Sequence, residues 1–374
     1  MIASYFINSP DNKIVQNTTT EILSRKNALA FHKTLKGYKS TPLVSLPGLA
    51  RKYGVGNIYL KDESHRFGLN AFKALGAVFA IDQLLATNPH LQTFCTATDG
   101  NHGKAVAWGA SLFGKKSVIY VPHDTTENRM KAIEAYGARV EKVNGNYDDA
   151  CARAESMSNA NGWQLVQDMA WQGYEEIPAN IVAGYMSLFV EMEDTINTLP
   201  KAKIDVVFVQ AGVGSFAAAA AFYYLNRYGG MRPKIVIVEP LEADAIFSSF
   251  VEGKVTTSKG NATTIMAGLN CGTPSLGAWD LLKSGVDVSL KIDDAFAREA
   301  MRELYYPVQG DQRVISGESG SAGLAGLMAI VREKELEAVK QALNINDQTN
   351  ILLISTEGDT DKKVFEEVVG IRHK

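Results

Sequence analysis

The chain has 374 residues, of which 46% are hydrophobic and 21% charged, so it can bury a substantial core and is long enough for about two domains. Its 38 basic and 41 acidic residues give a formal net charge of -3, which supplies no general field to hold a polyanion such as nucleic acid. Three widely spaced cysteines without a CxxC pair and six histidines without an HExxH spacing indicate neither a disulfide framework nor a metal site.

The N-terminal stretch MIASYFINSPDNKIVQN has no basic region followed by an apolar run. No later segment approaches about 20 uninterrupted apolar residues, the length that a membrane helix needs. We therefore expect a cytoplasmic protein whose partner is a small molecule, and neither a nucleic acid nor a membrane.

Short apolar runs rich in β-branched residues alternate along the chain with alanine-rich segments of helical spacing. The runs predict strands at 57–60, 117–121, 140–143, 164–166, 206–209, 235–238 and 351–354. This alternation is typical of an α/β protein with largely parallel sheets covered on both faces. Glycine and proline cluster at the strand ends, where open α/β sheets bind ligands, so the function is expected in those loops.

The first such loop leads to Lys73, which is the only charged residue between Gly68 and Ala80, at the expected start of a buried helix. A lysine in that place commonly extends its ammonium group to water. Alternatively, a lysine buried among apolar neighbours loses its charge readily and becomes a nucleophile toward carbonyl groups, the usual route to a Schiff base.

The second loop is TATDGNHG at 96–103, which precedes an apolar helix expected at 104–113. Unpaired N–H groups and the positive end of the helix dipole suit this loop to a carboxylate or a phosphate. An ordinary Asp or Asn cap with a glycine turn explains the same residues equally well.

The third loop, QAGVGS at 210–215, lies between the strand at 206–209 and an alanine-rich helix expected at 216–224. Its glycines allow close approach of a phosphate to the backbone, although neither a complete GxGxxG nor a P-loop motif is present. A phosphate site is therefore favoured over a plain turn.

The fourth loop, ISTEGDTD at 354–361, ends a strand in hydroxyls and acids. The alternative interpretation is a polar loop that caps a helix.

A nucleophilic lysine, a backbone cup for a phosphate, a second cup for a carboxylate and a hydroxyl at a strand end are what pyridoxal phosphate carrying an amino acid requires. The chain resembles the fold type II pyridoxal-phosphate enzymes, the group of threonine dehydratase and the tryptophan synthase β subunit. Within that group it is similar to the diaminopropionate ammonia-lyases through KDESHRFGLNAFK, TATDGNHGKAVAW, QDMAWQGY, QAGVGS, VEP, TIMAGLNCG, ISGESG and ISTEGDTD. These motifs follow in order from Lys61 to Asp361 and span most of the chain.

The resemblance implies an α/β fold of two open parallel-sheet domains with pyridoxal 5′-phosphate in the cleft between them. Residues 1–80 and 190–374 would form a large cofactor-binding domain. Residues 81–189 would form a small mobile domain that carries the TATDGNHG loop and closes over the substrate. Enzymes of this group are usually homodimers.

The resemblance also assigns roles to positions that match the family motifs. Lys73 would form the Schiff base, Phe72 would wall the cofactor, Asn101 would bond its phenolic oxygen, and either Ser355 or Thr356 would face its pyridine nitrogen. Glu318 corresponds to an acid that dehydratases keep near the cofactor. The expected phosphate cradle comprises Gly212, Val213, Gly214 and Ser215, and the expected substrate-binding residues are Thr98, Asp99, Gly100, His102 and Asp168.

Two acids, Asp99 and Asp168, distinguish the chain from simple dehydratases. Acids repel a substrate carboxylate unless the substrate brings additional positive charge or a proton to be moved, and 2,3-diaminopropionate meets that condition whereas serine and threonine do not. The resemblance implies α,β-elimination of the D and L isomers to pyruvate and two ammonia through an aminoacrylate. Lys73 would be the base for the L isomer, Asp99 the base for the D isomer, and Asp168 would bind or protonate the leaving amine.

Three alternatives stay open at this point. Asp99 alternatively caps the helix expected near Gly103. The chain is alternatively a serine or threonine dehydratase or a β-replacing synthase, which would use the same lysine. It is alternatively a non-catalytic protein that binds pyridoxal phosphate or an amino acid, because a fold does not guarantee activity.

Overall fold

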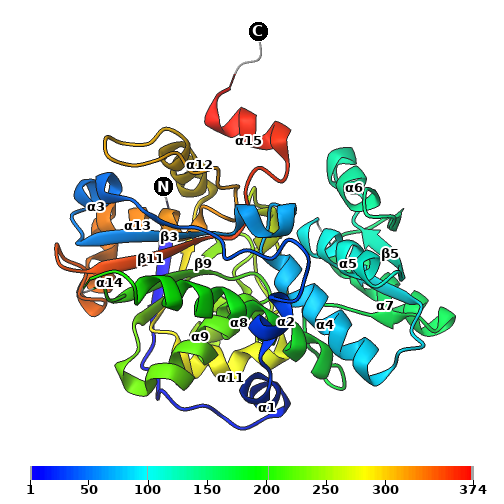
Figure 1. The fold of residues 1–374 in the computed structure, drawn as a ribbon. Helices are drawn as coiled ribbons and strands as arrows, with labels where there is room; N and C mark the ends of the chain where they lie inside the picture. Colours follow the sequence, from blue (N-terminus) through cyan, green and yellow to red (C-terminus); the bar gives the residue numbers. More distant parts are fainter. Residues whose placement is uncertain (1, 99, 201, 372–374) are drawn as a thin grey trace.

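Residues 2–98, 100–200 and 202–371 are described by the computed structural model, and their strands form two separate sheets (Figure 1). The larger sheet has the order β1-β10-β9-β8-β11-β3-β2 and the smaller one the order β6-β5-β4-β7. The strands of the larger sheet are β1 (Ala3–Ile7), β2 (Leu43–Ser45), β3 (Asn57–Asp62), β8 (Val206–Gln210), β9 (Lys234–Pro240), β10 (Val288–Ile292) and β11 (Asn350–Ser355). Those of the smaller sheet are β4 (Thr93–Ala97), β5 (Lys116–Val121), β6 (Arg139–Lys142) and β7 (Gln164–Leu165).

The five central strands of the larger sheet and all four strands of the smaller sheet run parallel, which confirms the expected architecture. The two edge strands of the larger sheet differ, because β1 pairs with β10 and β2 pairs with β3 in the antiparallel sense. Strands β1, β2, β4 and β10 were not among those predicted. Their sequences explain this, since ASYFI and VSLKI mix polar with apolar residues, TFCTA has little aliphatic content and LVS is only three residues long.

Helices cover both faces of the larger sheet, and the strand sequences show why. Val206 and Phe208 pack into one apolar cluster, whereas Val207 and Val209 pack into another on the opposite face. Successive side chains of a strand point to opposite faces, so a strand covered on both sides must be apolar throughout. The first cluster includes residues of α3 (Pro47–Tyr53), α12 (Asp294–Tyr305), α13 (Ala322–Arg332) and α14 (Glu337–Ala342). The second includes residues of α4 (Lys73–Thr87), α8 (Glu176–Ile196), α9 (Ser215–Tyr228) and α11 (Leu276–Gly285).

The α-helices are α1 (Thr18–Arg25), α2 (Ala28–His32), α3 (Pro47–Tyr53), α4 (Lys73–Thr87), α5 (Asn101–Leu112), α6 (Glu127–Glu134), α7 (Tyr147–Asn161), α8 (Glu176–Ile196), α9 (Ser215–Tyr228), α10 (Ala245–Glu252), α11 (Leu276–Gly285), α12 (Asp294–Tyr305), α13 (Ala322–Arg332), α14 (Glu337–Ala342) and α15 (Lys362–Val369). Short 3₁₀ helices are η1 (Glu63–Gly68), η2 (Gly229–Met231), η3 (Ala267–Leu269) and η4 (Lys334–Leu336).

Helix α4 connects the two sheets, because it packs against α8 on the side of the larger sheet and against α5 on the side of the smaller sheet (Figure 1). Its residues 74–81 are all buried, as expected of an apolar helix between two layers. The strands β4 to β7 all fall within 81–189 and the other strands outside that range. Within the described part of the chain, no helix is both long and apolar enough to cross a membrane.

Candidate active site

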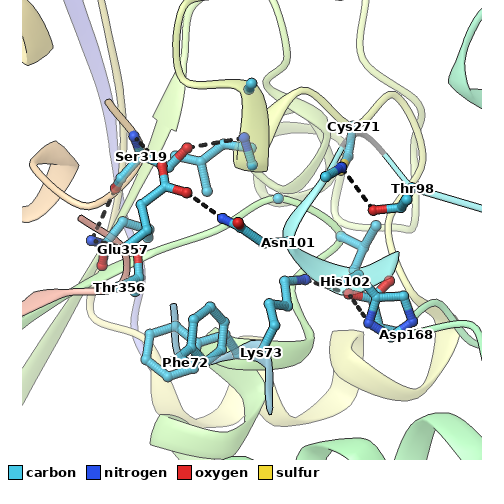
Figure 2. A pocket seen from close by; sticks show the side chains of 18 of the residues that line it. Phe72, Lys73, Thr98, Asn101, His102, Asp168, Cys271, Ser319, Thr356 and Glu357 are labelled. Atoms are coloured by element: carbon cyan, nitrogen blue, oxygen red, sulfur yellow. Dashed lines mark hydrogen bonds and ion pairs between the residues drawn. The ribbon is translucent and has the colours of Figure 1, made fainter. Parts of the chain in front are cut away.

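A pocket with an empty volume of about 1140 Å³ lies where the carboxyl ends of β4, β7, β8 and β11 meet the start of α4 (Figure 2). This is the edge at which open α/β sheets bind ligands. Twelve of the residues predicted from the sequence line it, namely Phe72, Lys73, Thr98, Gly100, Asn101, His102, Asp168, Gly212, Val213, Gly214, Ser215 and Thr356. Asp99 lies outside the described residues.

Two backbone hydrogen bonds join the residues just before Lys73 to the loop after β11. The N–H of Phe72 donates to the carbonyl of Thr356 at 3.0 Å, and the N–H of Gly358 donates to the carbonyl of Asn70 at 3.0 Å. The Phe72 ring packs on two buried aromatic rings behind it. The loop after β11 therefore fixes the position of α4 at the residue where its lysine begins.

The ammonium group of Lys73 contacts the carboxylate of Asp168, which follows β7 (Figure 2). Burial by itself lowers the pKa of Lys73, but the Asp168 carboxylate raises it, and the net pKa lies above the ordinary value. Burial likewise raises the pKa of Asp168, but the charge and hydrogen bond of Lys73 lower it to about 2. The expectation that apolar burial would discharge Lys73 is wrong for this structure, because a buried counter-charge outweighs desolvation.

His102 lies beside the same carboxylate, with Nδ1 3.8 Å from Oδ2 of Asp168. Its Nε2 bonds the carbonyl of Val166 at 2.8 Å, so Nε2 carries the proton and the Nδ1 of a neutral ring presents a lone pair. Nδ1 is one of the buried side-chain atoms without a hydrogen-bond partner in the described structure. Burial lowers the pKa of His102, so the neutral ring is favoured.

The loop between β4 and α5 is organised by the hydroxyl of Thr98. This oxygen accepts the N–H groups of Gly100 at 2.8 Å and Gly103 at 3.0 Å, while the N–H of Thr98 donates to Tyr120. Helix α5 begins at Asn101, three residues before the predicted start. The amides of Thr98 and Gly100 are thus already bonded, whereas the first amides of α5, from Asn101 and His102, have no partner within the helix.

The predicted phosphate loop forms a glycine turn at the start of α9. Gly214 has φ of +93°, a conformation that side chains with a Cβ rarely adopt, and α9 begins at the next residue. The hydroxyl of Ser215 donates to the carbonyl of Asp168 at 2.6 Å. The turn and the segment after β7 are thereby linked beneath the pocket.

Of the two hydroxyl candidates after β11, Thr356 lines the pocket, whereas Ser355 is completely buried and donates to Ser316 at 2.8 Å. Neighbouring strand residues point to opposite sides, so only one of the pair reaches the pocket. Glu318 is also buried, with its Oε1 unpaired in the described structure, and it does not line the pocket, whereas its chain neighbour Ser319 does.

Sequence reasoning did not assign roles to several residues that the pocket brings together. The carboxylate of Glu357 accepts from the side-chain amide of Asn101, and Gln210 donates to the carbonyl of Ile354 at 2.6 Å. The sequence could have indicated Glu357 as a pocket residue, because this acid directly follows the two hydroxyl residues Ser355 and Thr356 at the end of a strand. Other unassigned lining residues are Lys104, Arg129, Ala132, Tyr147, Phe216, Ala267, Gly268, Leu269, Cys271, Ser319 and Thr360.

A model of the family described as pyridoxal-phosphate dependent enzymes matches residues 34–347. The chain belongs to this family. It is an enzyme of the fold type II class, and its cofactor is pyridoxal 5′-phosphate.

Relatives within the family agree with this assignment. Diaminopropionate ammonia-lyase of Escherichia coli (strain K12) is 39% identical over 388 residues, which cover 98% of this chain and 97% of that enzyme. The crystal structure of diaminopropionate ammonia lyase from Escherichia coli in complex with an aminoacrylate-PLP azomethine reaction intermediate matches with a TM-score of 0.91 and 37% identity, covering 98% and 97% of the two chains. Threonine deaminase isoform 2 from Solanum lycopersicum has the same fold, with a TM-score of 0.79 and 20% identity over 99% and 98%.

The pocket of this chain fits the cofactor. A lysine amine, a glycine turn at the N-terminus of a 14-residue helix and a strand-end hydroxyl face one space. Two buried atoms beside that space, His102 Nδ1 and Gln210 Oε1, have no protein partner in the described structure. No group of three or more histidine, cysteine or acidic residues suited to a metal ion occurs among the residues described.

Proposed function

We propose that this enzyme is a diaminopropionate ammonia-lyase that converts D- and L-2,3-diaminopropionate and one water into pyruvate and two ammonia by α,β-elimination. The observation that carries the proposal is the contact of the Asp168 carboxylate with the Lys73 amine in the pocket. A carboxylate there stabilises a second positive charge near the reacting amine, which a diamine substrate brings and a hydroxy amino acid does not. The 39% identity to the Escherichia coli enzyme over nearly the whole chain supports the same choice.

Bound pyridoxal phosphate supplies an aldehyde carbon for covalent attachment of an amine and a ring that accepts an electron pair. Lys73 would hold the aldehyde carbon through Nζ, with Phe72 as a wall. Asn101 would donate to the phenolic oxygen. Thr356 would face the ring nitrogen, because it lines the pocket and Ser355 does not.

The phosphate would be held at the start of α9, where the turn of Gly212, Val213 and Gly214 precedes Ser215. Unpaired N–H groups and the helix dipole both favour an anion there. Because the Ser215 hydroxyl donates to the Asp168 carbonyl, the backbone would provide most of this binding.

The substrate carboxylate would be held by the first amides of α5, from Asn101 and His102, in a loop shaped by Thr98 and Gly100. Asp99 belongs to the same loop in the sequence.

Two bases are needed because the two isomers present the Cα proton on opposite faces when the carboxylate and the β-carbon keep their sites. Lys73 would take the proton of the L isomer and Asp99 that of the D isomer. The Asp168 carboxylate would hold the β-amine in its protonated form, so that the amine leaves as ammonia with the proton it already carries. Nδ1 of His102 lies 3.8 Å from Oδ2 of the same carboxylate.

We also propose that residues 81–189 form a small domain that closes over the substrate, against a large domain of 1–80 and 190–374, and excludes water during proton transfer. Polar contacts at the pocket already join the two sides. Asn101 contacts Glu357, and Nε of Arg129 lies 3.7 Å from Oδ2 of Asp361. A homodimer and a cytoplasmic location accompany the proposal as predictions, and light scattering of the purified enzyme would test the first.

The test compares ammonia and pyruvate release from D- and L-diaminopropionate with release from serine and threonine. The enzyme is expected to release two ammonia per pyruvate from both isomers of the diamine, much faster than from the hydroxy amino acids. Turnover must be measured, because a crystal structure of the Escherichia coli enzyme is a complex with D-serine and binding therefore does not discriminate. Faster turnover of serine or threonine would establish a dehydratase instead, and an absorbance change with no product would indicate a binding protein.

A further inference from the structure

We propose that Glu357 is a positioning residue that fixes the side-chain amide of Asn101 so that one of its N–H groups faces the cofactor. The inference rests on the proposed role of Asn101 at the phenolic oxygen of the cofactor. It assigns a function to a buried pocket acid that the reaction described above does not use.

Glu357 receives hydrogen bonds at both carboxylate oxygens. Oε1 accepts the backbone N–H of Ser319 at 3.1 Å, and Oε2 accepts from the side-chain nitrogen of Asn101 and from the hydroxyl of Thr360 at 3.4 Å. An ionised carboxylate can only accept, so it must face the nitrogen of the Asn101 amide and not its oxygen. The orientation of Asn101 is therefore determined by the charge of Glu357.

The acid next to Glu357 in this region, Glu318, has a raised pKa. Burial raises the pKa of Glu318, and the charge of Glu357 raises it further, to about 7. Two adjacent carboxyl groups in a buried site do not both ionise easily. The charge of Arg129 lowers the pKa of Glu318 and that of Asp361 raises it.

The carboxylate cannot easily move away from Asn101, because its backbone is tightly enclosed. A Cβ at Gly320 would lie 2.5 Å from the carbonyl oxygen of Glu357, and a Cβ at Gly317 would lie 2.4 Å from that of Gly358. Only glycines fit at those two positions without displacement of the loop. The side chain is 5% exposed, so water is a poor substitute for its partners.

Asn101 lines the pocket, and its side-chain nitrogen carries a second N–H that does not bond Glu357. A donor that faces a phenolic oxygen stabilises the anionic form of that oxygen. In Glu357→Gln the amide oxygen would retain the N–H of Ser319, so the amide nitrogen would meet Asn101. Two donors then face each other, and Asn101 must turn its oxygen toward position 357, which removes its donor from the cofactor.

The experiment measures two properties of the resting enzyme that do not require turnover, namely the pKa at which the visible absorbance of the bound cofactor titrates and the dissociation constant of the cofactor. In the wild-type background Asn101→Ala is expected to raise that pKa by about one unit. In the Glu357→Gln background the same substitution is expected to change it little, because the donor has already turned away. Glu357→Gln is expected to weaken cofactor binding by about tenfold.

Asp359 offers a matched control, since it lies in the same loop and accepts from the side-chain amide of Asn70 at 2.9 Å, but does not line the pocket. Asp359→Asn should leave both properties unchanged. Glu357→Asp keeps the charge but loses the reach, so it should resemble Glu357→Gln, which would show that the charge acts only in contact with Asn101.

The outcomes are distinguishable. If Asn101→Ala shifts the pKa equally in both backgrounds, Glu357 does not act through Asn101 and the inference is wrong. If Asn101→Ala shifts nothing in the wild type, the proposed role of Asn101 itself fails. If Glu357→Gln does not fold, the same comparison is made in the Glu357→Asp background.

Discussion

Lys73 and Asp168 form a part-buried ion pair across the pocket, between the first residue of α4 and the segment that follows β7. The two residues are separated by 95 positions in the chain. The pair sets both charges before any ligand arrives, because Asp168 raises the pKa of Lys73 and Lys73 lowers that of Asp168.

Replacement of Lys73 by alanine tests the covalent step. The variant is expected to fold, since the lysine is a functional group at a helix start, but to lose both covalent attachment of the cofactor and turnover. Mass spectrometry after borohydride reduction would detect the attachment, and circular dichroism would report the fold. Unchanged turnover would exclude Lys73 as the residue that binds the cofactor.

Replacement of Asp168 by asparagine removes the charge that holds the proton of Lys73 and the proposed partner of the leaving amine. We expect kcat/KM to fall by about 10²-fold or more on both isomers of diaminopropionate, because the amine leaves in the same way from each. The pKa of Lys73 should fall in the cofactor-free protein. A loss confined to one isomer would contradict a role in departure of the amine.

Asp99→Asn separates the two faces of the substrate. If Asp99 is the base for the D isomer, the variant should lose about 10²-fold or more of its activity on D-diaminopropionate and keep much more on the L isomer. Steady-state rates on each pure isomer provide the measurement. An equal loss on both would identify Asp99 as a capping or positioning residue and would overturn the two-base hypothesis.

Gly214→Ala tests the phosphate turn. The φ of +93° is strained for alanine, and the new Cβ would lie 3.1 Å from side-chain carbons of Ile246 and Leu282. We expect a loss of about 1–3 kcal/mol in cofactor binding or stability. Gly253→Ala is a suitable control, because Gly253 has a φ of +70°, is exposed and meets nothing within 4 Å. The control should lose stability without losing cofactor, and equal cofactor retention by both variants would place the phosphate elsewhere.

Glu318→Gln tests the protonated buried acid. The pKa of Glu318 rises from 4.5 to about 7 through burial and the neighbouring Glu357 charge. Its contribution to stability is therefore complete below pH 4.5 and is lost as the pH rises through about 7. The glutamine variant avoids that loss, so its stability relative to the wild type should increase by on the order of 1 kcal/mol between about pH 5 and about pH 8.

Thermal unfolding of both proteins at the two pH values would measure the effect. Glu335→Gln, at an exposed position, should show no such change. An unchanged difference for Glu318→Gln would mean that Glu318 is already ionised at the lower pH.

The sequence by itself determined the parallel core and the places where chemistry occurs. Val206 to Val209 is apolar on both sides of a strand, and this requirement of a doubly covered sheet is visible without coordinates. Lys73 stood out because a charge in an apolar helix start demands an explanation. The edge strands were missed because their half-exposed or very short sequences carry little of that pattern.

The tertiary structure alone decided which of these residues meet and in what charge state. The charge of Lys73 depends on Asp168, a partner brought to it by packing of two sheets, and desolvation without that partner predicts the opposite shift. Thr356 lines the pocket and Ser355 does not, and this difference depends on which way the chain faces at the end of β11. The contact of Asn101 with Glu357 joins segments 256 positions apart, and no local pattern encodes it, because hydrogen-bond and Coulomb energies depend on distance in space and not along the chain.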